Sequence, residues 1–167
     1  ELLKAIKEKY PRMDFLNISG PGVGGFCLPK DALVMHDSLK DNKELESDFG
    51  DIVNFPLSQF NLNENIIHYN AHQIESRLSE GAKILALGIA FKGEPHTDDT
   101  RDSVGLKVID YLKNKDFLIE VSDLSVSKDK ILKLGHKNAD LDLLNTFDAI
   151  LFLNNDRRYK DLIKRYY

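Results

Sequence analysis

The chain has little cysteine, no excess of basic residues and no long apolar run. Cys27 is its single cysteine, so an internal disulfide is excluded and a reducing, cytoplasmic setting is the simplest expectation. The 23 Lys and Arg residues, against 27 Asp and Glu, are scattered and leave a net charge of −4, which does not favour a nucleic-acid partner. No apolar run approaches the roughly 20 residues that cross a bilayer, so we expect no membrane-spanning segment.

The length of the chain is that of one ordinary domain, or of one domain with an appended helical piece. It has 167 residues, of which 42% are hydrophobic, enough for a packed core. It opens on Glu1-Leu2-Leu3 without Met and without a signal-peptide pattern, already in a helical pattern. We therefore expect a fragment whose natural start lies upstream.

Residues 1–80 have a helical pattern. Residues 1–9 resemble the end of a helix that stops before Pro11, and residues 31–40 predict a short helix. Residues 61–79 predict a longer helix, because apolar side chains recur at three- and four-residue spacing. The polar, turn-rich segment 41–59 is the one that we expect to be flexible.

Residues 81–167 alternate between strand and helix patterns. Three short apolar runs predict buried parallel strands: Lys83–Ala90, Phe117–Val121 and Ala149–Leu153. Helical patterns follow them: one capped by Asp102 or Ser103, one over Leu141–Phe147, and one over residues 157–166. This order predicts an α/β, Rossmann-like parallel sheet with helices on both faces, preceded by the helical segment 1–80.

A glycine-rich turn at residues 20–25 precedes the cysteine. Its sequence, GPGVGG, satisfies the G-x-G-x-x-G pattern of dinucleotide-binding loops, but no strand–helix–strand unit surrounds it. A structural turn without a ligand is a second interpretation. We favour a third, in which Gly22, Gly24 and Gly25 let the backbone approach a bound substrate.

Cys27 directly follows this turn, where it would be exposed beside such a ligand. Lys30 would favour the thiolate, and Asp31 would orient a water molecule or a lysine. A buried structural cysteine is the usual alternative. The flanking residues lead us to prefer a nucleophile.

The loop from Phe91 to Asp102 lies between the first strand and a helix N-terminus, a common place for a phosphorylated ligand. Lys92 offers a point charge to a diphosphate and Arg101 a two-pronged guanidinium, while Phe91 offers a flat ring to a base. The alternative is that the acids of this loop cap the helix and pair with Lys92 and Arg101.

Two segments resemble the UDP-glucose/UDP-N-acetylmannosamine/GDP-mannose dehydrogenase family. Residues 20–31 (GPGVGGFCLPKD) are similar to the family's cysteine loop, close to G-x-G-x-G-G-x-C-x-P-K-D. Residues 87–93 (LGIAFKG) and 97–103 (TDDTRDS) are similar to its C-terminal pattern, near L-G-x-A-F-K-x-x-T-D-D-x-R-x-S. The resemblance extends over most of the chain.

The resemblance implies a nucleotide-sugar 6-dehydrogenase, which oxidises the primary alcohol of a UDP-sugar to a carboxylate with two NAD. It implies that Cys27 forms the covalent adducts and that Asp31 assists their hydrolysis. It also implies that Lys92 contacts substrate phosphate, that Arg101 contacts the NAD pyrophosphate, and that Arg12 reaches the substrate of a neighbouring subunit.

It further implies a homodimer built on the long helix. The NAD-binding N-terminal domain that the family has is missing from these residues, and so is a helix that carries an oxyanion-stabilising Lys and Asn. We therefore expect the 167 residues to be inactive alone.

The sequence departs from the family pattern at four places, which leave the sugar and the base open. Phe26 stands where the family often has Ser or His, and His96 lengthens the second motif by one residue. Leu124 follows Asp123 where the family often has Pro, and Asn154 replaces a common Thr after the third strand.

The five histidines show no metal-ligand spacing, so we predict no metal site. The second functional hypothesis is a non-catalytic module for nucleotide-sugar binding or dimerisation, which would bind a UDP-sugar without turnover.

Overall fold

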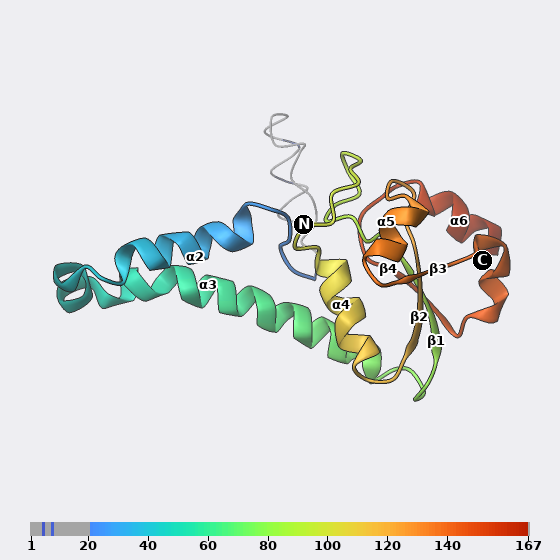
Figure 1. Ribbon diagram of the computed structural model, residues 1–167, viewed down its shortest axis with the longest axis horizontal. Helices are drawn as coiled ribbons and strands as arrows, with labels where there is room; N and C mark the ends of the chain where they lie inside the picture. The colour runs from blue at the N-terminus through green and yellow to red at the C-terminus, as the bar shows by residue number, and fades with distance from the viewer. Residues whose placement is uncertain (1–4, 6–7, 9–20, 167) are drawn as a thin grey trace.

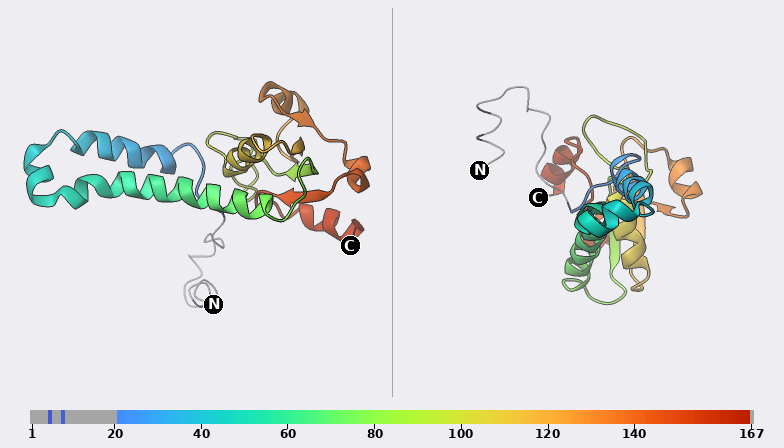
Figure 2. Two further views of the ribbon diagram at one scale, coloured as in Figure 1. Left: turned by 90° about the horizontal axis from the view of Figure 1, so that it is seen from below. Right: turned by 90° about the vertical axis from the view of Figure 1, so that its left-hand side faces the viewer.

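The structure, a computed structural model, describes residues 5, 8 and 21–166. A helical arm, formed by α2 (Leu28–Leu39) and α3 (Lys43–Glu75), projects from a body that contains a sheet (Figure 1). The two helices of the arm lie side by side, and the C-terminal end of α3 reaches the body (Figure 2). In the part of the chain that the structure describes, no helix is both long and apolar enough to cross a membrane.

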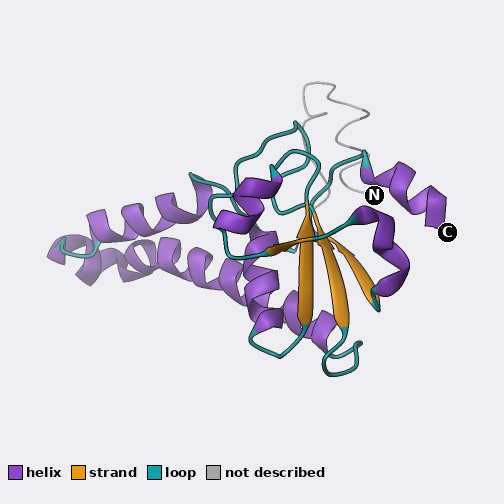
Figure 3. Cartoon of the chain, turned by 45° about the vertical axis from the view of Figure 1, so that its right-hand side comes forward, coloured by secondary structure: helices purple, strands orange, loops and turns teal. Residues whose placement is uncertain are grey.

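The body is built on four parallel strands in the order β3-β2-β1-β4 (Figure 3). Their bounds are β1 (Lys83–Leu87), β2 (Leu118–Ser122), β3 (Lys137–Asn138) and β4 (Ala149–Phe152). The order reverses beside β1, since β2 lies on one side of it and β4 on the other. Parallel α/β sheets bind ligands outside the carboxyl ends of the strands at such a reversal.

Helices cover both faces of the sheet, as the sequence predicts. Their bounds are α4 (Val104–Lys113), α5 (Lys128–Lys133), the 3₁₀-helix η2 (Leu141–Thr146) and α6 (Tyr159–Tyr166). Ile84 and Ala86 of β1 join a core with α3, α4 and α5, whereas Leu85 and Leu87 join one with η2 and α6. This burial on both faces explains why β1 is an unbroken apolar run.

The expectation of a flexible segment at 41–59 is wrong, because α3 begins at Lys43 and runs through it. The Asn42 side chain caps the helix by accepting a hydrogen bond from the Leu45 amide at 3.1 Å. Only Phe49 interrupts the helical backbone, and Val53 is buried in the arm. Packing against α2 supplies the burial that makes this polar stretch helical.

The bounds of other helices differ from the sequence predictions by a few residues. The helix α2 begins at Leu28 instead of residue 31, with a proline in its first turn, and α3 ends at Glu75 instead of residue 79. The short α5 and β3 have no counterpart in the sequence prediction. The helix expected over residues 1–9 lies outside the described residues, apart from positions 5 and 8.

Candidate functional site

Cys27 lies at the N-terminal end of α2, where it occupies the N-cap position and is exposed. Its carbonyl accepts a hydrogen bond from the Asp31 amide at 2.9 Å, which starts the helix. The free N–H groups and the dipole of a helix N-terminus favour a negative charge at this position. The structure therefore has the cysteine exposed at a helix N-terminus, and not in the core.

The first turn of α2 also presents Lys30 and Asp31 next to the cysteine. Their side chains form an exposed ion pair, with Lys30 Nζ 2.6 Å from Asp31 Oδ1. This hydrogen bond is the main reason why the pKa of Lys30 is raised. Both groups predicted to assist Cys27 are thus close to it in the chain and accessible to a ligand.

The turn before Cys27 is clamped to α3 by a side chain of that helix. Asn63 Oδ1 accepts a hydrogen bond from the Val23 amide at 2.7 Å, and Asn63 Nδ2 donates to the Val23 carbonyl at 2.8 Å. A Cβ on Gly22 would lie 2.5 Å from Ile67 Cγ1. Gly22 therefore allows this turn to lie against α3, a close approach to protein that the sequence does not predict.

The same turn lies directly on the second candidate loop, residues 91–102. The Gly25 amide donates a hydrogen bond to the Asp102 carbonyl at 3.2 Å, and a Cβ on Gly24 would lie 2.5 Å from that oxygen. Gly25 has a φ of +97°, and its Cβ position is 2.8 Å from the ring of Phe91. These contacts join the two loops that carry the predicted site residues.

Within the second loop, Asp99 holds Arg101 in place. Arg101 Nη2 lies 2.6 Å from Asp99 Oδ2, and Arg101 Nε donates to the same carboxylate at 3.0 Å. The hydrogen bonds from Arg101 lower the pKa of Asp99 to about 2. At neutral pH Asp99 is therefore ionised and Arg101 is a fixed cation.

Arg101 and Lys92 both lie over aromatic rings near the cysteine turn. The Arg101 guanidinium carbon is 4.2 Å from the centre of the Phe26 ring, and Lys92 Nζ is 5.1 Å from that of Phe91. Gly24, Gly25, Phe91 and Arg101 thus lie where the two loops meet. Cys27 and Asp31 follow this turn in the chain, Lys92 Nζ lies over the Phe91 ring, and Gly22 lies against α3. Arg12 lies outside the described residues.

The loop between β4 and α6 supports the second loop from behind, a role the sequence does not predict. Asn155 Oδ1 accepts a hydrogen bond from the Gly93 amide at 2.9 Å, and Asn154 Nδ2 donates to the Ala90 carbonyl at 3.3 Å. A Cβ on Gly93 would overlap the backbone of Asp156. The available signal was the run of polar residues after the third strand, where the carboxyl ends of parallel strands meet.

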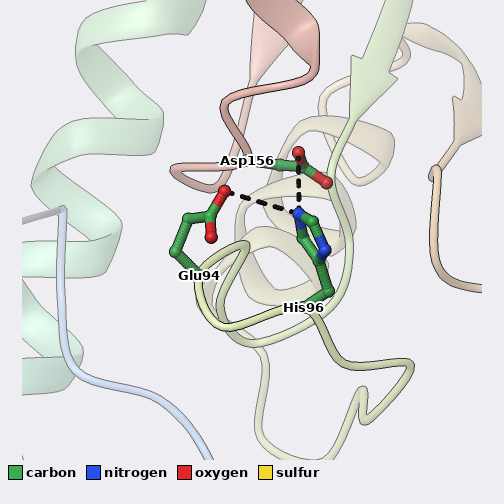
Figure 4. A group of neighbouring side chains, drawn as sticks. All are labelled: Glu94, His96 and Asp156. Carbon is green, nitrogen blue, oxygen red and sulfur yellow. Dashed lines mark ion pairs between the residues drawn. The ribbon is translucent and has the colours of Figure 1, made fainter.

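Three possible metal ligands lie close together between the loop after β1 and the loop between β4 and α6 (Figure 4). His96 Nε2 lies 3.4 Å from Glu94 Oε1 and 3.6 Å from Asp156 Oδ1. Asp156 Oδ1 already accepts two hydrogen bonds from Arg158, and Arg158 also binds the other oxygen of this buried carboxylate. We therefore interpret the group as a polar cluster between the loop after β1 and the loop between β4 and α6.

Comparisons with known proteins agree on one family. Residues 85–167 match the model of the UDP binding domain of the UDP-glucose/GDP-mannose dehydrogenase family. A UDP-N-acetyl-D-mannosamine dehydrogenase of Methanococcus aeolicus is 30% identical over 163 residues, which are 95% of this chain and 33% of that protein. A UDP-glucose 6-dehydrogenase of Rickettsia prowazekii is 28% identical over 155 residues, which are 89% of this chain and 34% of that protein.

A solved structure shares the fold over nearly the whole chain. The UDP-glucose dehydrogenase of the hyperthermophilic archaeon Pyrobaculum islandicum superposes with a TM-score of 0.72 at 24% identity, and the match covers 95% of this chain and 36% of that one. The chain thus spans about a third of the length of these relatives. The two sequence motifs, the parallel sheet and these matches together show that the chain belongs to the UDP-glucose/GDP-mannose dehydrogenase family.

Proposed function

We propose that this chain supplies the catalytic cysteine and the nucleotide-sugar-binding part of an NAD-dependent nucleotide-sugar 6-dehydrogenase of the cytoplasm. The observation that supports this most is the hydrogen bond between Gly25 and Asp102. It brings the exposed thiol of Cys27 next to the loop that carries Lys92 and Arg101. The proposed nucleophile is then next to a loop with one cation for the substrate phosphates, Lys92, and one for the pyrophosphate of NAD, Arg101.

Cys27 is the proposed nucleophile for a sugar that has been oxidised to the aldehyde. Its thiolate adds to the aldehyde carbon, and the oxygen of the thiohemiacetal takes a proton. Loss of a hydride from that carbon, which NAD would accept when bound, together with loss of the hydroxyl proton to water, leaves a thioester on Cys27. Water then attacks the thioester, and the carboxylate and the free thiol are released. Asp31 is the proposed orienting group for this water.

Lys92 and Phe91 are the proposed binding groups for the nucleotide, and Arg101 is the proposed group for the pyrophosphate of NAD. NAD supplies the hydride acceptor when it is bound. The Arg101 side chain is 60% exposed, and the bonds to Asp99 use only Nε and Nη2, so its remaining N–H groups suit a pyrophosphate. We propose that the nicotinamide is held by a region of the protein outside these 167 residues.

Calorimetry with UDP-sugars tests the binding role of the second loop. Lys92→Ala should weaken binding by about 1.5–3 kcal/mol, the usual contribution of a hydrogen bond to a charged group. Lys43→Ala removes an equal charge from the exposed start of α3 and should leave binding unchanged. Equal affinities for both variants would contradict the role of Lys92. Binding that is never followed by turnover, even with the longest natural chain, would favour the non-catalytic module instead.

A homodimer is the second part of the proposal, and the surface of the arm supports it. Large apolar side chains are exposed along α2 and α3: Leu28, Val34, Met35, Phe49, Ile52, Phe55, Leu62 and Ile66. Near the cysteine turn, an apolar pocket of ≈ 350 Å³ opens between the two helices. Exposed apolar patches of this kind mark interaction surfaces. Sedimentation should therefore give a dimer for the natural protein and a monomer for Phe55→Asp.

A further inference from the structure

Two cations lie near the ring of Phe26, the residue that precedes Cys27. The guanidinium carbon of Arg101 is 4.2 Å from the ring centre and Lys30 Nζ is 5.2 Å from it. The Phe26 side chain is about half exposed (51%), so it is not a core residue. An apolar ring kept at the surface against two cations calls for a role other than packing.

The backbone places Arg101 next to this ring independently of the side chains. The Gly25 amide is hydrogen-bonded to the Asp102 carbonyl, so the residues that follow Gly25 and the residue that precedes Asp102 are neighbours. Phe26 and Cys27 are on one side of that bond, and Arg101 is on the other. Glycine at position 24 is needed for this approach, because any Cβ there would lie 2.5 Å from the Asp102 oxygen.

Each of the two cations also forms an ion pair with an acidic residue. Arg101 is bonded to Asp99 and Lys30 to Asp31. The pKa of Arg101 is raised mainly by its hydrogen bond with Asp99, and the charge of Cys27 is among the smaller causes. Because Phe26 precedes Cys27 and its ring lies 4.2 Å from the Arg101 guanidinium carbon, Arg101 lies near the cysteine, while Asp99 binds only Nε and Nη2 of the guanidinium.

We propose that Phe26 is a positioning residue whose ring holds the guanidinium of Arg101 beside the sulfur of Cys27. An exposed arginine samples many rotamers, and the ring is the second anchor that keeps its charge on the cysteine side. A cation at this place makes the electrostatic potential at the sulfur more positive. The inference rests on the proposed role of Cys27 and adds the group that sets this potential.

A pair of alkylating reagents tests the proposal on the 167-residue chain without sugar or NAD. Iodoacetate carries a negative charge and iodoacetamide carries none, and both react with the same thiolate of the only cysteine. The ratio of their rates therefore cancels exposure and thiolate fraction, and reports the electrostatic potential at the sulfur. A purely structural role for Phe26 would not change this ratio.

Arg101→Gln should lower the iodoacetate-to-iodoacetamide ratio by about two- to fivefold, the effect of one nearby exposed charge. Phe26→Leu should lower it by a similar factor, and Phe26→Tyr, which keeps an aromatic face, should restore it. Phe26→Leu should have no further effect in the Arg101→Gln background. At about 1 M salt, where the screening length is about 3 Å, the ratios of all variants should converge.

The matched control is Lys115→Gln, which removes an equal charge from a similar cation–ring pair, 5.7 Å from Tyr111 and in another part of the fold. This variant should keep the natural ratio. The proposal is overturned if either Phe26→Leu or Arg101→Gln keeps the natural ratio. It is also overturned if Phe26→Leu lowers the ratio further in the Arg101→Gln background, because the ring would then act through Lys30. Because no substrate is present, a failure of UDP-sugar binding or turnover would count against the proposed function alone.

Discussion

At the scale of single residues, the environment of Cys27 differs from that of a structural cysteine in three respects. It is exposed, it occupies the N-cap position of α2, and the glycine turn before it is hydrogen-bonded to the loop that carries Arg101. Each of these favours reaction with an electrophile at the surface. The three features come from different parts of the chain, and only their combination supports a nucleophile.

We expect iodoacetamide to label Cys27 in the folded protein at neutral pH, and a saturating UDP-sugar to slow the labelling. The physical reason is that the thiol is accessible beside the proposed sugar site, and that the thiolate is the reacting form. Mass spectrometry measures the rate. Labelling that requires denaturant, or that a bound UDP-sugar leaves unchanged, would contradict the role of this loop.

The low pKa of Asp99 leads to a prediction about how the stability of the folded protein changes at acidic pH. Its folded-state pKa of about 2 is below the usual value near 4 for an unfolded chain. Its contribution is therefore complete above about pH 4 and is lost as the pH falls through about 2. Asp99→Asn should lose less stability than the natural protein between about pH 5 and 2, and should cost less than about 1 kcal/mol at neutral pH because the pair is near the surface.

Thermal unfolding as a function of pH measures this difference. Asp98→Asn changes the same charge at the neighbouring position, where the side chain is 69% exposed, and serves as the control. If the curves of Asp99→Asn and the natural protein stay parallel down to about pH 2, the ion pair with Arg101 does not form in solution.

At the scale of elements, the loop after β1 depends on the loop after β4. The side chains of Asn154 and Asn155 form hydrogen bonds with the backbone of Ala90 and Gly93, and the Asp156 backbone packs against Gly93. The His96 ring also lies near Asp156 and Glu94. The segment that carries Lys92 is therefore fastened at the carboxyl edge of the sheet. Separation of the loop after β1 from the loop after β4 would therefore change the geometry of the proposed site.

Gly93→Ala should destabilise the protein and weaken UDP-sugar binding, because its Cβ would overlap the Asp156 backbone and separate the two loops. We expect a loss of about 1–3 kcal/mol in the free energy of unfolding, the usual range for overpacking. Chemical denaturation and calorimetry measure the two effects.

Gly50→Ala is the matched control for this substitution. It lies in the helical arm with no atom within 4 Å of its Cβ position, so it should raise stability by about 0.5–1 kcal/mol through helix propensity. A Gly93→Ala variant as stable as Gly50→Ala would mean that the loops are not in close contact.

At the scale of the whole molecule, the chain combines an arm with exposed apolar side chains and a body with a parallel sheet. The proposed site lies at the carboxyl ends of the strands of this sheet. The last half of α3 connects them, since Ile67 and Ala71 are buried in the core of the body. Docking of the arm and placement of the cysteine turn are therefore coupled through one helix.

The 167-residue chain alone should not reduce NAD in the presence of a UDP-hexose. Hydride transfer requires the nicotinamide about 3–3.5 Å from the sugar carbon, and such positioning contributes roughly 7–11 kcal/mol. Arg101 suits a pyrophosphate but does not position a nicotinamide ring. Absorbance of NADH measures the reaction.

Joining the chain to the proposed nicotinamide-binding region should restore the signal, and Cys27→Ser in that longer protein should abolish net acid formation. Reduction of NAD by the 167 residues alone would show that no further nicotinamide-binding region is needed.

The sequence by itself determined the features that depend on neighbours along the chain. The apolar runs predicted β1, β2 and β4, and β1 has no polar alternation because it is buried on both faces. The motif strings indicated the family that the comparisons show, because each string is made of residues close together in the chain. Ser103 as the cap of α4 was one of two predicted positions, and its hydroxyl accepts from the Leu106 amide.

The tertiary structure decided what depends on residues far apart in the chain. Residues 43–59 are helical because α2 lies against them, and the sequence pattern of the segment alone predicted a loop. Asn155 supports Gly93 across 62 positions and Asn63 clamps Val23 across 40, contacts that no local pattern encodes. Phe26 meets Arg101 only because two glycines allow two backbones to touch, and steric fit of this kind is settled by folding in three dimensions.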